Sequence, residues 1–473
     1  MISSGGLAAG SVRPLETPNS GVRVSPALPP FVPSADAPVL SSSFEGFDFD
    51  DNATETGGTY FIPPDPIAAA GPDRIIAVVN VMIEARTKAG VLIFRDALAD
   101  FFSSLTPTTF TFDPKVIYDQ YEGRFVVVTL EKVEGGGNPH PGNISRILLA
   151  VSKTSSPATA TSADWWYHAI DSKTVIGGTL EYWADYPGFA IDEEAVYVTN
   201  NMFTFLTGSF GGVRLWIVAK GLVGGFYGGG AASVSFHDPY ASAGLAVTTQ
   251  PAHVFGAGGV PSPPSAAGTS IGTFLVSYSG LTGGGLELVQ VVRVDDPLGT
   301  PAFVQEYVSV GDIEGPSFPD LPDAPQLGTG TLVEVNDRRA LNAVWRSGLL
   351  WMTATIIPNS GDDAGQTTAH WFKLSTAAVP GGAITLSDQG DIGGEDIAST
   401  TYTFFPAIAV NSTGDAAIGF SASASSIYPG AYFTGRFAAD PAGTNRGSGV
   451  LRAGVDYYIR TFGGPRNRWG DYS

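Results

Sequence analysis

A strand–turn–strand unit recurs along this chain, and its clearest copy is the stretch Glu181 to Phe203, EYWADYPGFAIDEEAVYVTNNMF. It opens with the polar segment Asp185-Tyr186-Pro187, which an apolar run follows. The chain then turns at Asp192-Glu193-Glu194 and alternates again from Ala195 to Thr199. Two short apolar runs separated by a tight polar turn are typical of paired antiparallel strands.

Variants of this unit start near residues 65, 113, 185, 252, 323, 406 and 471, at intervals of 48 to 83 residues. Each interval has room for four short strands with their loops, and repetition at such a period is typical of a β-propeller. We therefore predict an all-β β-propeller with six complete, mostly four-stranded antiparallel blades and a truncated seventh blade at the C-terminal end. A two-sheet sandwich is the alternative, but it predicts cleaner alternation and shorter intervals.

The first 58 residues differ from the rest, because seven prolines stand among serines and glycines there. Repeated proline prevents helices and central strands. The sequence thus predicts an extended Pro-rich leader over residues 1–58 and a β-propeller over residues 59–473.

Charge and composition exclude several classes of partner. Lys and Arg number 25 against 45 Asp and Glu, so the net charge is −20, which repels phosphate backbones and anionic lipid surfaces. There is no cysteine, and the five histidines form no close metal-binding pair. No apolar run is long enough to cross a membrane. We expect a monomer that binds neither nucleic acid nor the membrane interior.

Close carboxylates occur in the segment FDFDDN, at Asp48, Asp50 and Asp51. Carboxylate oxygens suit calcium, and these three residues are the predicted metal ligands. The spacing of an EF-hand is missing, so a solvated turn is the alternative.

Aspartates also recur where the repeat predicts the start of each innermost strand. In a propeller, these starts gather around the mouth of the central channel, where they could bind a polar ligand or calcium. The alternative is that each aspartate caps its own turn. Together with two nearby aromatic residues, the predicted ligand-binding set is Asp65, Asp113, Asp185, Tyr186, Asp323, Trp469 and Asp471.

Several motifs, among them PPDPIAAAGPD, DPKVIYDQYEGRFVVV, DYPGFAID, FFPAIAVNSTGDAAIGFS and RNRWGDYS, resemble a group of exported bacterial β-propeller proteins of poorly characterised function, some described as sialidase-like. The resemblance covers about residues 45 to 473. It implies an extracellular or cell-surface location, although the first residues lack a signal pattern. Members usually continue beyond RWGDYS, which implies that this chain is truncated within its last blade. The nearest match to a sialidase box, Ser360 to Ala364, lacks the required Gly and Trp.

The expected function is an extracellular or cell-surface binding scaffold that recognises a carbohydrate or a protein at the channel mouth. No catalytic motif favours an enzyme. Two alternatives stay open. One is a sialidase-like glycoside hydrolase or lyase that uses carboxylates at the same mouth. The other is a structural envelope protein without a ligand site.

Overall fold

A computed structural model describes residues 36–108, 111–240, 248–256, 271–278, 282–314, 320–379, 381–461 and 464–472. Residues 1–35, most of the predicted leader, lie outside the described residues. The chain forms two compact units. Unit 1 contains Phe44–Pro251 and Asp295–Phe303, and unit 2 contains Ala252–Val294 and Val304–Ser473.

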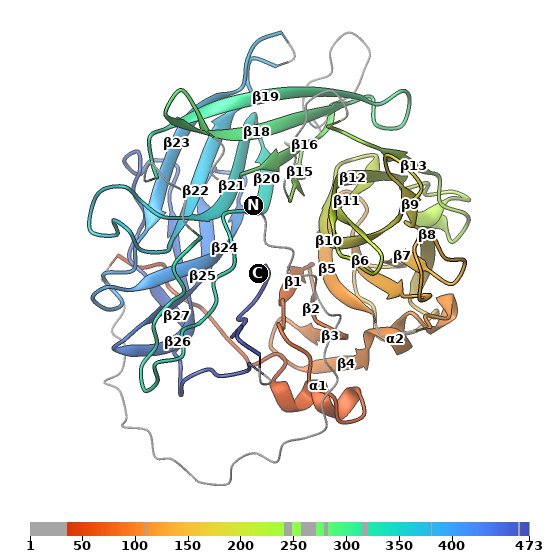
Figure 1. Ribbon diagram of the computed structural model, residues 1–473, viewed down its shortest axis with the longest axis horizontal. Helices are drawn as coiled ribbons and strands as arrows, with labels where there is room; N and C mark the ends of the chain where they lie inside the picture. Colours follow the sequence, from red (N-terminus) through yellow and green to blue (C-terminus); the bar gives the residue numbers. More distant parts are fainter. Residues whose placement is uncertain are drawn as a thin grey trace. The chain divides into compact units, whose positions relative to one another are not determined.

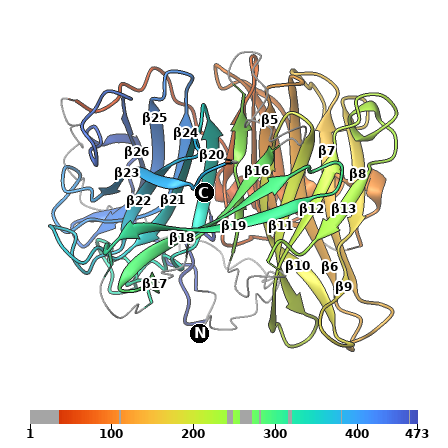
Figure 2. The same ribbon diagram turned by 90° about the horizontal axis from the view of Figure 1, so that it is seen from above.

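The fold is all-β, a six-blade β-propeller with three sheets in each unit (Figures 1 and 2). Each sheet has four or five strands, and nearly all neighbouring strands are antiparallel. The predicted fold class is confirmed, as are its six complete blades. The described residues after the last strand form no sheet that would count as a seventh blade.

In unit 1, sheet 1 has the order β1-β2-β3-β4, sheet 2 the order β5-β6-β7-β8 and sheet 3 the order β13-β12-β11-β10-β9. Their bounds are β1 Ile67–Ala70, β2 Arg74–Val79, β3 Met82–Thr87, β4 Leu92–Ala97, β5 Phe112–Asp119, β6 Arg124–Val133, β7 Ile144–Ser152, β8 Trp165–Asp171, β9 Thr174–Val175, β10 Glu181–Ile191, β11 Ala195–Thr204, β12 Phe210–Ala219 and β13 Val234–His237. The short strand β14, Gln250–Pro251, also belongs to unit 1.

In unit 2, sheet 4 is built on β18, sheet 5 has the order β15-β20-β21-β22-β23 and sheet 6 the order β24-β25-β26-β27. Their bounds are β15 His253–Phe255, β16 Ile271–Ser277, β17 Thr282–Gly283, β18 Leu286–Asp295, β19 Ala302–Gly311, β20 Ala340–Arg346, β21 Leu349–Ile356, β22 Thr368–Ser375, β23 Thr385–Ile392, β24 Tyr402–Val410, β25 Ala416–Ala424, β26 Ile427–Arg436 and β27 Gly449–Arg452. One pair departs from the predicted antiparallel pattern, because β15 runs parallel to β20.

Helices are few and short: α1 Phe49–Glu55, α2 Leu98–Phe101 and the 3-10 turns η1 Ser103–Leu105 and η2 Phe226–Gly228. Among the described residues, no helix combines the length and apolar character that a membrane crossing requires.

The middle strands are apolar on both faces because both faces are covered. In β6, the run from Phe125 to Val128 is fully buried, and its side chains alternate between two hydrophobic clusters of unit 1. Inner strands of neighbouring sheets pack against one another within each unit. In unit 1, β5 packs against both β1 and β10, and in unit 2, β20 packs against both β16 and β24. Asp65, just before β1, is therefore brought near Asp113 in β5 and near Asp185 and Tyr186 in β10.

Candidate functional site

Three inner strands of unit 1 share a backbone feature, which lies just before β1, near the start of β5 and in the middle of β10. Asp65, Asp113 and Tyr186 have φ values of 46°, 50° and 49°, and a proline follows each of them. Positive φ is uncommon for residues other than glycine. At Asp113 and Tyr186, the pairing with the next strand also shifts, which marks a β-bulge. Tyr186, one residue after Asp185, is thus the counterpart of Asp65 and Asp113.

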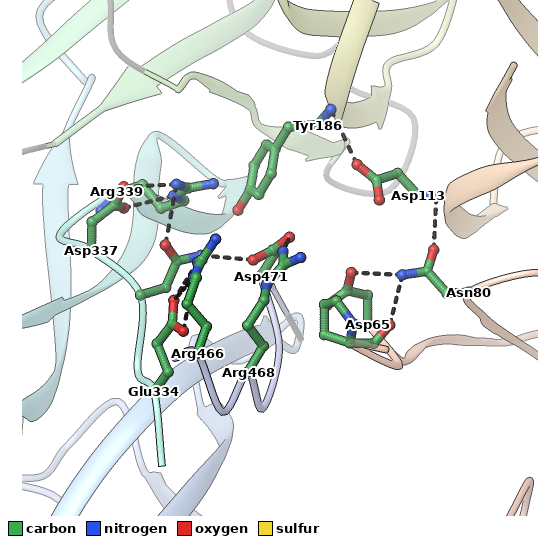
Figure 3. A network of polar contacts seen from close by, with 12 residues as sticks. Asp65, Asn80, Asp113, Tyr186, Glu334, Asp337, Arg339, Arg466, Arg468 and Asp471 are labelled. Atoms are coloured by element: carbon green, nitrogen blue, oxygen red, sulfur yellow. Dashed lines mark hydrogen bonds and ion pairs between the residues drawn. The ribbon is translucent and has the colours of Figure 1, made fainter. Parts of the chain in front are cut away.

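A chain of hydrogen bonds joins these starts across the three sheets of unit 1 (Figure 3). Asn80 Nδ2 donates to Asp65 Oδ2 at 3.0 Å, and Asn80 Oδ1 accepts from the backbone N–H of Asp113 at 2.8 Å. Asp113 Oδ2 then accepts from the backbone N–H of Tyr186 at 3.2 Å. All four residues are buried. The sequence prediction missed Asn80, although an asparagine at the end of an apolar strand recurs as Asn200 and was visible in VVN and VTNN.

Two further buried residues belong to this cluster. Asn200 Nδ2 donates to the backbone oxygen of the buried Asp185 at 3.1 Å. Lys115 Nζ donates to Gln250 Oε1 at 3.4 Å and lies 5.4 Å from the centre of the Tyr186 ring. A cation over an aromatic face is attracted by the ring quadrupole.

Four buried side-chain atoms on or beside these inner strands find no hydrogen-bond partner among the described residues: Thr111 Oγ1, Trp183 Nε1, Asn200 Oδ1 and Gln250 Nε2. Their residues are only 1%, 4%, 1% and 3% exposed. A buried polar atom without a partner costs about 1–3 kcal/mol, so such atoms are rare in folded proteins. A polar ligand would therefore have to reach buried atoms, namely two donors, one acceptor and one hydroxyl. We define these four residues, with Asp65, Asn80, Asp113, Lys115, Asp185 and Tyr186, as the strand-start cluster.

The Trp183 indole is held in place from several sides. Lys132 Nζ lies 3.9 Å from its ring centroid, and the Phe203 and Phe112 rings lie at 5.7 and 6.3 Å. Lys132 also forms an ion pair with Glu134 at 2.6 Å. These contacts fix the ring, and with it the direction of the indole N–H. Trp183 was not in the predicted ligand-binding set.

In unit 2, the remaining predicted ligand-binding residues have different surroundings. Asp471 Oδ1 accepts from Asn336 Nδ2 at 3.0 Å, and Trp469 Nε1 donates to Ser421 Oγ at 2.9 Å. Asp323 is exposed and accepts from the backbone N–H of Val335 at 3.4 Å. Neither Asp323 nor Asp471 starts a strand, so the predicted equivalence with Asp65 and Asp113 is wrong for these two. Their roles in ligand binding stay predictions.

Three arginines of unit 2 lie among these residues, and each has a carboxylate partner (Figure 3). Arg339 Nε contacts Asp337 at 2.6 Å, Arg466 Nε contacts Glu334 at 2.9 Å, and Arg468 pairs with Asp471. Because the charges are matched, this arginine cluster offers no excess positive charge to an anionic ligand.

The predicted calcium ligands surround the start of α1 in unit 1. Asp48 caps the helix by accepting from the backbone N–H of Asp51 at 2.7 Å, and Asp51 returns the contact at 3.1 Å and pairs with Arg95. Asp50 accepts from the Tyr60 hydroxyl at 3.3 Å. Throughout the described residues, no three His, Asp or Glu side chains are grouped so that they could hold a metal ion. Calcium at α1 stays a prediction.

The segment Ser360 to Ala364, the nearest match to a sialidase box, contributes one member of a pair of carboxyls in unit 2. The pair is Asp363 and Glu395. Burial, followed by a hydrogen bond with Glu395, raises the pKa of Asp363 to about 8. The two carboxyls converge on Gly393, where an added Cβ would lie 2.4 Å from Asp363 Oδ2 and 2.3 Å from Glu395 Oε1. When Asp363 is protonated, it can hydrogen bond to Glu395. The segment itself lacks the Gly and the Trp of a sialidase box.

Comparisons with known proteins give limited guidance. No family model matches the chain, and no curated protein matches it. Solved structures with a similar arrangement include an exo-1,5-α-L-arabinanase from a bovine ruminal metagenomic library, at 12% identity and a TM-score of 0.31 over 69% of this chain and 97% of that one. The apocarotenoid oxygenase of Synechocystis has 12% identity and a TM-score of 0.42 over 83% and 71%. The α-L-arabinanase of Penicillium chrysogenum has 11% identity and a TM-score of 0.37 over 83% and 95%. Likenesses of this size carry no inference about function, and the resemblance to exported propeller proteins stays an expectation.

Proposed function

We propose that this protein is a carbohydrate-binding β-propeller that holds its ligand at the strand-start cluster of unit 1. The observation that carries the proposal is the set of four unpartnered polar atoms at Thr111, Trp183, Asn200 and Gln250. A sugar hydroxyl both donates and accepts hydrogen bonds, so one kind of group can satisfy all four. The location that the sequence suggests, outside the cell or on its surface, is part of the proposal.

Glycoside hydrolysis at the same cluster is the second candidate. Asp65, Asp113 and Asp185 are buried on neighbouring inner strands of unit 1: Asp65 lies just before β1, Asp113 near the start of β5 and Asp185 in the middle of β10. Hydrolysis would require two carboxylates on opposite sides of the scissile bond, about 5–10 Å apart. Asp65 and Asp113 instead accept hydrogen bonds from Asn80 and from the Tyr186 backbone, which favours a role in positioning and binding.

Isothermal titration calorimetry with a panel of pentose and hexose oligosaccharides tests the proposal. Trp183→Phe keeps an aromatic ring but removes the indole N–H, and Asn200→Ala removes the unpartnered oxygen. Loss of one hydrogen bond predicts about a tenfold lower affinity for each variant. Trp166→Phe is the matched control, because this half-buried tryptophan lies on β8 under Lys153, outside the cluster.

Binding by no sugar of the panel would overturn the proposal, as would unchanged affinity in both cluster variants. Release of reducing sugar during the same titrations, lost in Asp113→Asn, would favour hydrolysis instead. Capture of a protein ligand that competes with no sugar would assign the cluster to protein recognition.

A further inference from the structure

Lys373 is a partly exposed lysine on β22 of unit 2, where it lies against a buried tryptophan. From its surroundings we propose that Lys373 is a site of covalent modification by small aldehydes. The amine nitrogen attacks the aldehyde carbon and forms an imine, and the carbonyl oxygen leaves as water. The reaction does not involve the strand-start cluster, so the inference goes beyond the proposed function.

The register of sheet 5 sets three side chains in one row. Lys373 lies opposite Trp351 on β21 and opposite Asp388 on β23. Side chains of directly paired residues stand on the same face of a sheet. Lys373 Nζ lies 4.9 Å from the centroid of the Trp351 ring, and Trp351 is 1% exposed. The amine is therefore close to a buried apolar surface, although its own side chain still reaches solvent in part.

The carboxylate that could pair with Lys373 has other partners. Asp388 Oδ2 accepts from Arg436 Nη1 at 2.7 Å, and Arg436 is buried. Asp388 Oδ1 accepts from the backbone N–H groups of Gln389 and Gly443 at 3.0 and 2.8 Å. Within the described residues, Lys373 forms no hydrogen bond or ion pair of its own. Its amine thus lies beside a second cation whose counterion is already engaged.

These surroundings disfavour the protonated form of the amine. Burial, followed by the positive charge of Arg436, lowers the pKa of Lys373, against the opposing attraction of Asp388. A lysine in water has a pKa of about 10.4 and is almost fully protonated at pH 7. Only the neutral amine has the lone pair that attacks a carbonyl carbon, and burial or a neighbouring cation is a known way to obtain it. The reactive fraction of Lys373 is therefore raised.

Lys88 is the matched comparison within the same chain. It is exposed in the turn between β3 and β4, and within the described residues it also forms no ion pair. Accessibility alone predicts faster modification of Lys88. The charges and burial around Lys373 predict the opposite order at neutral pH.

Glycolaldehyde is the probe, applied to the full chain at limited conversion between pH 7 and pH 10. Sodium borohydride then donates hydride to the imine and leaves a stable secondary amine, which peptide mass spectrometry quantifies at each lysine. At pH 7 we expect at least about threefold more label on Lys373 than on Lys88, because each unit by which a pKa falls raises the neutral fraction about tenfold. The ratio should decrease as the pH rises, since both amines then become neutral. Equal or lower labelling of Lys373 at pH 7, or a ratio that does not change with pH, would overturn the inference.

Two variants test whether the neighbouring charges cause the reactivity. Arg436→Gln removes the positive charge and leaves Asp388 to attract a proton to Lys373. Ser375→Asp adds a carboxylate two residues along β22, on the same face as Lys373, and keeps the buried ion pair intact. In each variant the ratio of label on Lys373 to label on Lys88 at pH 7 should fall several-fold. Ser375→Asp decides the matter if Arg436→Gln does not fold, and an unchanged or higher ratio in a folded variant would contradict the proposal.

Discussion

The side-chain oxygen of Asn80, just after β2, accepts a hydrogen bond from the backbone N–H of Asp113, at the start of β5, at a distance of 2.8 Å. The amide nitrogen of the same side chain donates to Asp65 and to the backbone oxygen of Pro63. One asparagine therefore fixes the start of its own sheet and the start of the next. The inner strands β1 and β5 of these two sheets pack against each other, and the hydrogen bonds of Asn80 connect them.

Replacing Asn80 by alanine should destabilise unit 1. The change leaves a carboxylate oxygen and two backbone groups buried with fewer partners, and each such loss costs about 1–3 kcal/mol. We expect the free energy of unfolding, measured by urea denaturation, to fall by about 2–4 kcal/mol. Lys88→Ala, in an exposed turn, is the control and should change stability by less than about 0.5 kcal/mol. A similar small loss for Asn80→Ala would contradict this account of the linked strand starts.

Two substitutions of Asp48 can distinguish its role as the N-cap of α1 from a role in calcium binding. Asp48→Ala removes the cap and should cost about 1 kcal/mol, whereas Asp48→Asn keeps most of it, because asparagine is an equally good N-cap. If calcium binds Asp48, Asp50 and Asp51, added calcium should raise the thermal midpoint of the wild type, and this gain should disappear in Asp48→Asn. No calcium-dependent change in the wild type would leave these carboxylates as cap and ion-pair partners only.

The strands of the propeller could be predicted because apolar runs and the turns between them depend on residues that are close in the sequence. In the stretch from Glu181 to Phe203, the apolar runs became β10 and β11, and Asp192 closes the turn by accepting from the backbone N–H groups of Glu194 and Ala195 at 2.8 and 2.7 Å. Such a turn depends only on residues a few positions apart.

Fewer residues of the candidate site could be predicted from the sequence, because the contacts that form the site join residues far apart in the chain. The alignment of Asp185 with Asp65 was shifted by one residue, since the shared feature is the positive φ before proline, which Tyr186 has. Asn80 and Trp183 were missed because their roles depend on partners in other sheets, at Asp113 and Phe112. Asp323 and Asp471 matched the repeat by composition alone, although their segments form no strand.

Asp192 should make stability depend on pH. Burial raises its pKa to about 6, against the opposing hydrogen bond from the Tyr197 hydroxyl at 2.6 Å. The folded state thus holds the proton more tightly than the unfolded state. The stabilisation is complete below the ordinary pKa of about 3.9 and is lost as the pH rises to about 6. Relative to Asp192→Asn, the wild type should lose on the order of 2–3 kcal/mol across this window in urea denaturation. Parallel pH profiles for the two proteins would contradict the raised pKa.

The raised pKa of Asp363, beside Glu395, predicts a second, separate pH dependence in unit 2. The pKa of Asp363 is raised to about 8, chiefly by burial and then by Glu395, so the folded state again binds the proton more tightly. The stabilisation is present at acidic pH and is lost as the pH rises through about 8, which extends beyond the window of Asp192. Between pH 6 and 8, the thermal midpoint of the wild type should therefore fall, and Asp363→Asn should fall less. Asp456→Asn, at an exposed position of unit 2, is the control and should follow the wild type. If the thermal midpoints of Asp363→Asn and the wild type instead fall equally, the pKa of Asp363 is not raised by burial and by Glu395.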